Sequence, residues 1–358
     1  MRKWSALEEA VIPAIVAILI AAVIGDLLIL SFGQSPSDVF RLLLEGTWGN
    51  AYGFGQVLYK ATTLTFTGLA VSLGLRAGLF NVGAESQLAA GGFAAAMLGL
   101  ILPHGLPSLL VLPVFILAAA LGGGVVGSIP GVLKAKFGAH EVITTIMLNF
   151  IVMALLNYLV AVHFKVEGSL HTREIAAGQI PRLDAVAPAF HGSAANFVLV
   201  LALVAAVAVA WYLFRTRRGF ELRAVGLQPQ AAEYGGVAVG SVWLRAMIAS
   251  GAIAGIGGLN YVLGYKHFYE EGFAGGAGFL GIAVAIVGRT NPFGVVLAAL
   301  LFATISQGGL AVNAIVPKEF VDVLQAVVII AVAASVPAVR RLLRSREAVA
   351  PVPSGVEG

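Results

Sequence analysis

Hydrogen-bonding side chains interrupt the long apolar stretches of this sequence at positions where a lipid-facing helix would carry none. They are Asn81, Glu85, Gln87, Thr145, Asn149, Asn157, Asn260 and Gln307. A polar group inside a bilayer must find a partner, so we expect each of them to face the interior of a helix bundle. Uncharged hydrogen-bonding groups along a pathway suit a neutral polar solute better than an ion. Hydrogen bonding between helices is the plainer alternative for each residue taken singly.

Three of these positions belong to a row with helical spacing. Glu141, Thr145 and Asn149 follow one another at intervals of four residues, and Asn157 comes eight residues after Asn149. Residues four apart lie on nearly the same face of a helix. The row therefore predicts one polar face on an otherwise apolar helix.

The segment Arg76–Gln87, of sequence RAGLFNVGAESQ, separates two apolar runs with glycine, amide and acid side chains. Asn81 or Gly83 can cap the start of the following helix. Glu85 then lies in the first turn, where the helix dipole favours an acid. Broken helices with polar ends often line transport pathways. A short cytoplasmic turn with ordinary capping explains the same pattern, and the sequence leaves both interpretations open.

Several kinds of enzyme site are missing from the sequence. It contains no phosphate loop of the form Gly-x-x-x-x-Gly-Lys-Ser/Thr, so the chain cannot bind ATP by that device. It has no zinc pattern of the form His-Glu-x-x-His, no nucleophile elbow in a plausible context, and no cysteine. We therefore expect a protein that is not an enzyme and that binds no cofactor itself.

The elements that position these residues are predicted to be membrane-spanning helices. The chain is 59% hydrophobic and only 11% charged. Its apolar runs are long enough to cross a hydrocarbon core of roughly 30 Å, and helices satisfy their own backbone hydrogen bonds in lipid. The fold class is therefore an all-α polytopic membrane protein with about ten transmembrane helices, some broken or short. The predicted crossings are residues 11–31, 56–76, 84–102, 108–133, 142–163, 195–214, 243–264, 276–289, 293–312 and 320–340.

Lysine and arginine predict the orientation of the chain. Counting alternate loops gives about a twofold excess of basic residues on the side that includes the N-terminus. Both termini are therefore placed in the cytoplasm. We expect residues 1–345 to form one transmembrane domain and residues 346–358 to form a disordered tail. The basic residues gather at membrane edges, which explains the high isoelectric point without a nucleic-acid partner.

The longest basic loop, near residues 215–242, lies on the predicted cytoplasmic side. It begins with Arg215, Arg217 and Arg218, and Pro229 can start a short helix, Pro229–Tyr234, after Gln228 as the cap. Because the chain lacks a phosphate loop for ATP, we expect a separate protein to supply the energy and to act on the membrane helices through this loop. A solvated basic loop at the lipid surface is the alternative.

A second long loop, Lys165–Ala194, falls on the predicted outer side. It mixes charges and prolines with His171 and His191. Histidines spread this loosely make a poor metal site, so we expect a solvated extracellular loop.

Four stretches resemble one family of membrane proteins. Phe80–Gln87 (FNVGAESQ) and Glu141–Asn149 (EVITTIMLN) are similar to blocks of bacterial ABC-importer permeases of the branched-chain amino acid and simple-sugar superfamily. Gly219–Gly236 resembles their cytoplasmic coupling loop, with a Leu-Arg-Ala-Val-Gly core. Gly281–Gly288, followed by Asn291 and Pro292, matches a fourth block. The likeness is greatest to the nucleoside-type permeases.

The resemblance implies a set of partners: a homologous second permease subunit, two cytosolic ABC ATPase subunits, an extracellular substrate-binding lipoprotein and the lipid bilayer. It also implies that ATP and Mg²⁺ bind the ATPase and not this chain, and that the protein lies in the bacterial inner membrane. The residues it assigns to the ATPase-coupling loop are Gly219, Arg223, Ala224, Gly226, Gln228, Pro229, Ala231, Ala232, Glu233 and Tyr234.

The function that the resemblance implies is that of a nucleoside permease subunit. Permeases for simple sugars or branched-chain amino acids share several of the same features. An ion-coupled secondary transporter would need ionisable residues along its pathway, and the spans supply few beyond Asp26, Glu85 and Asp322.

Overall fold

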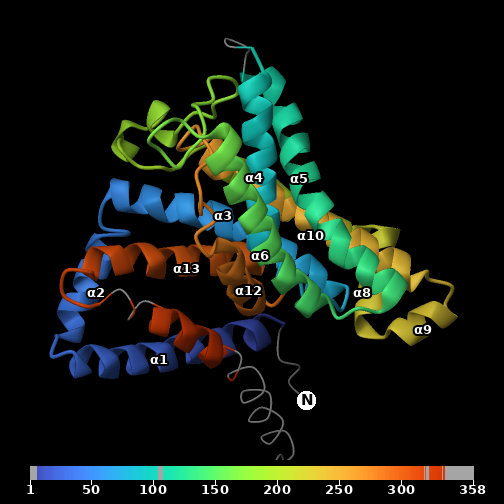
Figure 1. Ribbon diagram of the computed structural model, residues 1–358. Coiled ribbons are helices and arrows are strands. Elements are labelled where there is room, and N and C mark those ends of the chain that lie inside the picture. The colour runs from blue at the N-terminus through green and yellow to red at the C-terminus, as the bar shows by residue number, and fades with distance from the viewer. Residues whose placement is uncertain (1–5, 104–107, 318, 320–321, 333, 335–358) are drawn as a thin grey trace, which may run out of the picture. The chain divides into compact units, whose positions relative to one another are not determined.

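The computed structural model describes residues 6–103, 108–317, 319, 322–332 and 334, and its regular structure is helical (Figure 1). Strand-like pairing in this part of the chain is limited to three isolated bridges. The prediction of an all-α fold is confirmed. The predicted tail 346–358 and both chain ends lie outside the described residues.

The helices, in chain order, are α1 Ala6–Ser31, α2 Pro36–Glu45, α3 Ala51–Arg76, α4 Ala84–Ile101, α5 Ser108–Phe137, α6 Glu141–Leu159, α7 Val198–Arg215, α8 Arg217–Leu227, α9 Pro229–Tyr234, α10 Val239–Gly257, α11 Leu259–Val262, α12 Ala277–Val287 and α13 Pro292–Val312. A π-helical turn, Val160–Phe164, extends α6, and a short apolar helix covers Asp322–Val332.

Six helices of the described chain are long and apolar enough to cross a membrane. They are Ala84–Ile101, Leu110–Phe137, Glu141–Phe164, Val198–Arg215, Val239–Val262 and Pro292–Val312. A seventh span results if Leu19–Ser31 and Pro36–Glu45, which bend by 113°, are counted as one. The chain is thus a multi-pass membrane protein, whereas ten crossings and the sides of the termini remain predictions.

Helix α3 is long enough to cross a membrane, but its sequence is more polar than those of the six candidate spans. Its 26 residues reach about 39 Å at 1.5 Å per residue. The hydroxyl of Thr62 donates to the carbonyl of Leu58 at 2.8 Å, and that of Thr65 donates to Ala61 at 2.8 Å. Most of the helix is buried, so its polar groups meet protein and not lipid.

The chain divides into two compact units, one formed by residues 1–43 with 309–358 and the other by residues 44–308. All the site residues discussed below belong to the second unit. The prediction of one domain over residues 1–345 stays a prediction.

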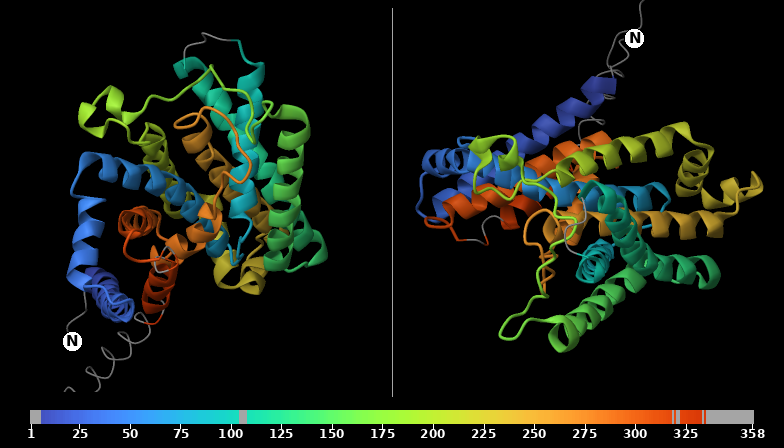
Figure 2. Two further views of the ribbon diagram at one scale, coloured as in Figure 1. Left: turned by 60° about the vertical axis from the view of Figure 1, so that its left-hand side comes forward. Right: turned by 90° about the horizontal axis from the view of Figure 1, so that it is seen from above.

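Within the second unit, α4, α5 and α10 pack side by side (Figure 2). The helices α5 and α10 touch through glycines. A Cβ atom on Gly127 would overlap the carbonyl oxygen of Met247, and one on Gly255 would lie 3.0 Å from the Cα of Gly123. Small residues let backbones approach closely where no hydrophobic force pulls helices together. The glycine spacing therefore fixes which helices are neighbours.

Helix α12 is only 11 residues long and packs against α3 and α4. At 1.5 Å per residue it extends about 16 Å, roughly half of a hydrocarbon core. The prediction of a short helix within residues 276–289 is confirmed, whereas its crossing of the membrane stays a prediction.

Candidate functional site

The loop predicted to couple to a motor forms two short helices, α8 and α9. The hydroxyl of Thr216 caps α8 by accepting from the backbone N–H of Gly219 at 3.0 Å. Helix α9 begins at Pro229, whose fixed φ suits a first helical position. Its bounds, Pro229–Tyr234, are those predicted, although the side chain of Gln228 makes no capping bond.

One ion pair joins α8 to the first part of α10. The carboxylate of Glu221 lies 3.2 Å from the Arg217 Nε and 3.7 Å from the Arg245 guanidinium. The side chain of Arg217 is mostly exposed, so its pair contributes little, while Arg245 bridges two helices. The loop therefore has a defined conformation against the bundle.

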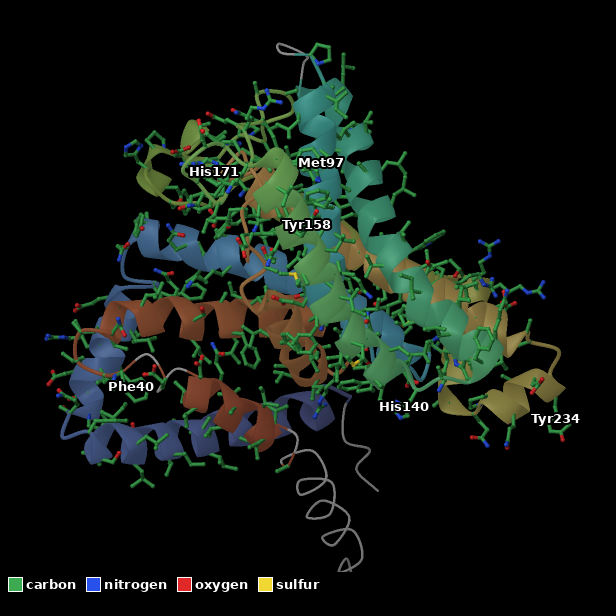
Figure 3. All side chains as sticks on the ribbon, in the orientation of Figure 1. Phe40, Met97, His140, Tyr158, His171 and Tyr234 are labelled. Carbon is green, nitrogen blue, oxygen red and sulfur yellow. The ribbon has the colours of Figure 1, made fainter. Side chains whose placement is uncertain are left out.

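The coupling-loop residues split into an outward and an inward set. Gln228, Ala231, Glu233 and Tyr234 are exposed, and the side chain of Tyr234 is 96% exposed at the tip of α9 (Figure 3). The inward set consists of the buried Gly219 and Ala232 and of the half-buried Arg223, Ala224, Gly226 and Pro229. The outward set is thus the part of these ten residues that is most open to solvent.

A cavity of about 540 Å³ lies beside α9. Its walls are Ala135, Gln228, Pro229, Gln230, Glu233, Val239, Gly240 and Trp243. At its edge the Lys134 ammonium lies 5.4 Å from the ring centre of Trp243 and 2.8 Å from the Glu141 carboxylate. The end of the unit that carries α8 and α9 is thus polar, basic and hollowed.

The side chain of Asn81 joins three parts of the chain. Its Nδ2 donates to Gln87 Oε1 and to Ser250 Oγ, both at 2.8 Å. Its Oδ1 accepts from the Gly83 N–H at 2.9 Å and from Gln87 Nε2 at 3.2 Å. Ser250 Oγ in turn donates to the Ala70 carbonyl at 2.6 Å. All these side chains are buried, so the loop before α4 is fixed to α3 and α10.

Asn149 fixes the same loop to α6. Its Nδ2 donates to the Val82 carbonyl at 3.0 Å, and its Oδ1 accepts from the Ser86 N–H at 3.2 Å. Thr145, on the same face, donates to the Glu141 carbonyl of its own helix at 2.7 Å. The predicted polar face of α6 therefore meets the start of α4.

Glu85 holds the beginning of α12. One carboxylate oxygen accepts from the Gly276 N–H at 2.7 Å and the other from the Gly278 N–H at 2.6 Å. Glu85 itself lies in the first turn of α4, as predicted. Its side chain, which is 7% exposed, thus lies at the N-termini of two helices.

The remaining polar residues lie elsewhere. Asn260 Nδ2 donates to the Tyr59 carbonyl at 2.9 Å and to Thr63 Oγ1 at 2.8 Å, and its Oδ1 accepts from Asn196 Nδ2 at 2.9 Å. Gln307 is buried on α13. The Oδ1 of half-buried Asn157 has no hydrogen-bond partner among the described residues. The polar residues therefore form separate groups and not one continuous row.

The structure adds partners that the sequence did not single out. They are Ser86, Asn196, Ser250, Gly276 and Gly278. Glycine is common in this chain, and the bonds of these partners join segments far apart in sequence. No local pattern could have identified them.

The segment Lys165–Ala194 is more ordered than a solvated loop. It pairs with residues 263–271: the Thr172 N–H donates to the Tyr269 carbonyl at 2.8 Å, and the Ile180 N–H donates to Leu263 at 2.9 Å. This end of the second unit lies opposite α8 and α9 (Figure 1). No group of three His, Cys, Asp or Glu residues within the described ranges could hold a metal ion.

His267 lies in this paired region in a left-handed conformation, with φ of 62°. Burial lowers the pKa of its imidazole, and the nearby Arg182 guanidinium lowers the pKa further, against an opposing effect of Glu174. The neutral ring is thus favoured near neutral pH.

Residues 53–333 match the family of branched-chain amino acid transport system permease components. The guanosine ABC transporter permease protein NupP of Bacillus subtilis is 36% identical over 92% of this chain and 94% of its own length. The nucleoside ABC transporter permease protein NupB of Lactococcus lactis is 32% identical over 90% of both chains. The glucose ABC transporter permease protein TsgB13 of Haloferax volcanii is 32% identical over 88% of this chain and 85% of its own. No solved structure matches the chain.

Proposed function

This chain belongs to the family of branched-chain amino acid transport system permease components, and on that premise we propose that it is the membrane-spanning permease subunit of a bacterial ABC importer for nucleosides. The observation that carries the proposal is the full-length similarity to permeases named for guanosine and for nucleosides. The chain is therefore a transport component, and we place ATP hydrolysis on partner subunits.

The exposed side of α8 and α9 suits the docking of a cytosolic ATPase. Leu227 is 85% exposed and Tyr234 is 96% exposed, although large side chains of this kind are usually packed against other protein atoms. Aromatic residues presented in this way are frequent anchors of interfaces. When two ATPase subunits close on ATP, the docked loop would be pushed and would shift the bundle between outward and inward access.

The opposite end suits a receptor that delivers substrate. The paired segments 165–196 and 263–271 give that end a shaped surface, which an extracellular lipoprotein could bind without first ordering it. A homologous second permease would complete the pathway in the bacterial inner membrane. ATP and Mg²⁺ would bind the ATPase alone, and this chain would hold no cofactor.

The polar residues would then serve the pathway in two ways. The side chains of Asn81, Glu85, Gln87 and Asn149 are bonded to protein, so we infer that they hold the helices around the pathway. Asn157 keeps an unused acceptor, so it is the better candidate for contact with a solute. Thr145, Asn260 and Gln307 stay candidates for the lining through their positions on α6, α11 and α13.

A sugar permease is the second candidate, because a glucose permease is as similar as one of the nucleoside permeases. The two proposals are separated by reconstituting the complete transporter in vesicles and measuring ATP-driven uptake of labelled guanosine, with glucose and leucine as competitors. Guanosine uptake that resists both competitors supports the nucleoside assignment. Uptake of glucose in place of guanosine would support the sugar-permease assignment. Uptake that needs a proton gradient but no ATPase would contradict the assignment as an ABC importer.

A further inference from the structure

We propose that the segment Arg76–Glu85 carries the movement of the coupling loop to helix α12, and that Gly226 and Glu85 are the positioning residues at its two ends. The inference rests on the proposed function, because only a permease driven through its coupling loop has such a movement to transmit. Each step of the route is a direct contact within residues 44–308.

The route begins where α8 touches the turn after α3. A Cβ atom on Gly226 would overlap the Arg76 carbonyl oxygen and lie 3.0 Å from the Gly78 nitrogen. A Cβ atom on Gly78, whose φ is 75°, would in turn lie 3.3 Å from the Cα of Gly226. The two backbones are therefore in contact with no side chain between them. Because close-packed atoms cannot interpenetrate, a push on α8 must displace this turn.

A second contact joins the same elements through side chains. The ring of Phe214, at the end of α7, has the Arg76 guanidinium at 5.7 Å and the Arg223 guanidinium at 5.3 Å from its centre. Arg223 belongs to α8, and Arg76 also donates through Nε to the Thr290 carbonyl at 3.2 Å. Thr290 lies in the turn that ends α12 and begins α13. Arg76 thus links the coupling helix to the far end of α12.

The middle of the route is stiff. The Leu79 N–H donates to the Gly74 carbonyl at 2.9 Å, which closes the turn. Asn81 uses both of its side-chain polar atoms on Gln87, Gly83 and Ser250. Because both polar atoms of the buried Asn81 side chain are hydrogen-bonded, we expect the loop to move as a rigid body and not to bend when it is displaced.

The route ends at α12. The Glu85 carboxylate grips its first turn through the Gly276 and Gly278 N–H groups, and a Cβ atom on Gly278 would overlap the Glu85 backbone. Thr67 of α3 donates to the Ala277 carbonyl at 3.0 Å, beside these two bonds. Charge-assisted bonds of this kind are stronger than neutral ones. The beginning of α12 must therefore follow Glu85.

One segment consequently holds both ends of a helix that is too short to anchor itself across a membrane. Arg76 holds the turn at the end of α12, and Glu85 holds its first turn. Displacement of Arg76–Glu85 by the coupling loop would tilt or shift α12 as a unit. In this scheme α12 is the part of the bundle that opens or closes the pathway.

The test uses the complete transporter, with its ATPase subunits and receptor, in vesicles, and guanosine as the probe. Guanosine uptake and ATP hydrolysis are measured together for Gly226→Ala and for Glu85→Gln. We expect guanosine carried per ATP hydrolysed to fall by about tenfold in both variants, within the usual range of coupling between sites. The control is Gly124→Ala on α5, because a Cβ atom there meets its nearest neighbour at 3.5 Å, an ordinary contact.

A second readout follows α12 directly. The chain contains no cysteine, so Phe279→Cys, at a 49% exposed position of α12, gives it a unique thiol. We expect the maleimide labelling rate of this thiol to change when the ATPase is trapped closed with vanadate, and we expect Gly226→Ala and Glu85→Gln to abolish that change. If one of the two variants assembles poorly, the labelling rate in the other variant still tests the route.

The outcomes separate this inference from the proposed function. If the unmodified transporter carries no guanosine with ATP, the proposed function fails. If it does, and the variants keep both the ratio of guanosine to ATP and the labelling change, the route through Arg76–Glu85 is wrong. Parallel loss of uptake, hydrolysis and assembly with an unchanged ratio would also overturn it, because that is the result of a purely structural defect.

Discussion

The side-chain oxygen of Asn149 accepts the backbone N–H of Ser86 at 3.2 Å. The amide nitrogen of the same side chain donates to the Val82 carbonyl at 3.0 Å, so one residue of α6 replaces a missing helical partner at the start of α4. This arrangement gives Asn149 a structural task and distinguishes it from Asn157, two turns later, whose Oδ1 is unpartnered in the described chain.

We expect Asn149→Leu to lower the free energy of unfolding. The substitution leaves two buried backbone groups without partners, at a cost of about 1–3 kcal/mol for each. The unfolding midpoint of the purified protein in detergent measures the effect. Asn157→Leu is the matched control on the same helix, and it should leave the midpoint nearly unchanged. Equal falls of the unfolding midpoint in the two variants would show that the hydrogen bonds of Asn149 do not account for the loss of stability.

Tyr234→Ala should weaken binding of the partner ATPase. The side chain is 96% exposed at the tip of α9, so its removal cannot disturb the fold. An aromatic anchor of an interface is worth on the order of 2 kcal/mol when truncated. Pull-down of the ATPase with the detergent-solubilised permease measures the loss. Tyr158→Ala on α6, also at an exposed tyrosine, should bind normally, and normal binding by Tyr234→Ala would remove α9 from the interface.

Gly127→Ala should destabilise the contact between α5 and α10. The added methyl group would overlap the carbonyl oxygen of Met247, and overpacking of this kind costs about 1–3 kcal/mol. Thermal unfolding in detergent is the measurement. Gly124→Ala, one turn earlier on α5, should be neutral, because a Cβ atom there would meet its nearest neighbour at 3.5 Å. A neutral result for Gly127→Ala would mean that the helices can separate without penalty.

The end of the molecule opposite the coupling loop should lose stability in mild acid. Because burial and Arg182 lower the pKa of His267 in the folded state, the unfolded chain binds its proton more readily below the ordinary histidine pKa of about 6.5. Stability is therefore complete above that pH and falls as the pH drops toward the lowered folded-state pKa. Hydrogen exchange of residues 165–180, measured between pH 7 and 5, should reveal the loss.

His267→Asn should remove this pH dependence, because asparagine tolerates the left-handed φ of 62° and carries no titratable group. His191→Asn is the control, since His191 is an exposed histidine at the same end of the second unit. If both variants retain the acid effect, another group is responsible.

Local patterns in the sequence predicted the parts of the structure that depend on local physics. The apolar runs predicted membrane-spanning helices, of which six in the described chain are long and apolar enough, and Pro229 predicted the start of α9. Glu85 lies in the first turn of α4 because an acid suits that position in any helix.

Contacts between distant segments could not be predicted in this way. The partners of Glu85 lie 191 and 193 residues away, and those of Asn149 lie on another helix. The predicted crossings 11–31 and 56–76 leave residues 32–55 as a connecting loop, whereas these residues contain α2, whose amphipathic pattern is only ten residues long. The pairing of 165–180 with 263–271 uses backbone groups, which every residue carries, so composition gives no sign of it.

The separation between Glu85 and Gly276 also determines the order in which the chain can be completed. At about 5–20 residues per second, a ribosome needs about 10–40 s to make the 191 residues between them. During that interval the Glu85 carboxylate has neither of its backbone partners. The part of the chain that carries Glu85 is therefore made well before α12, and the Glu85 carboxylate gains its two backbone hydrogen bonds only when α12 has been synthesised.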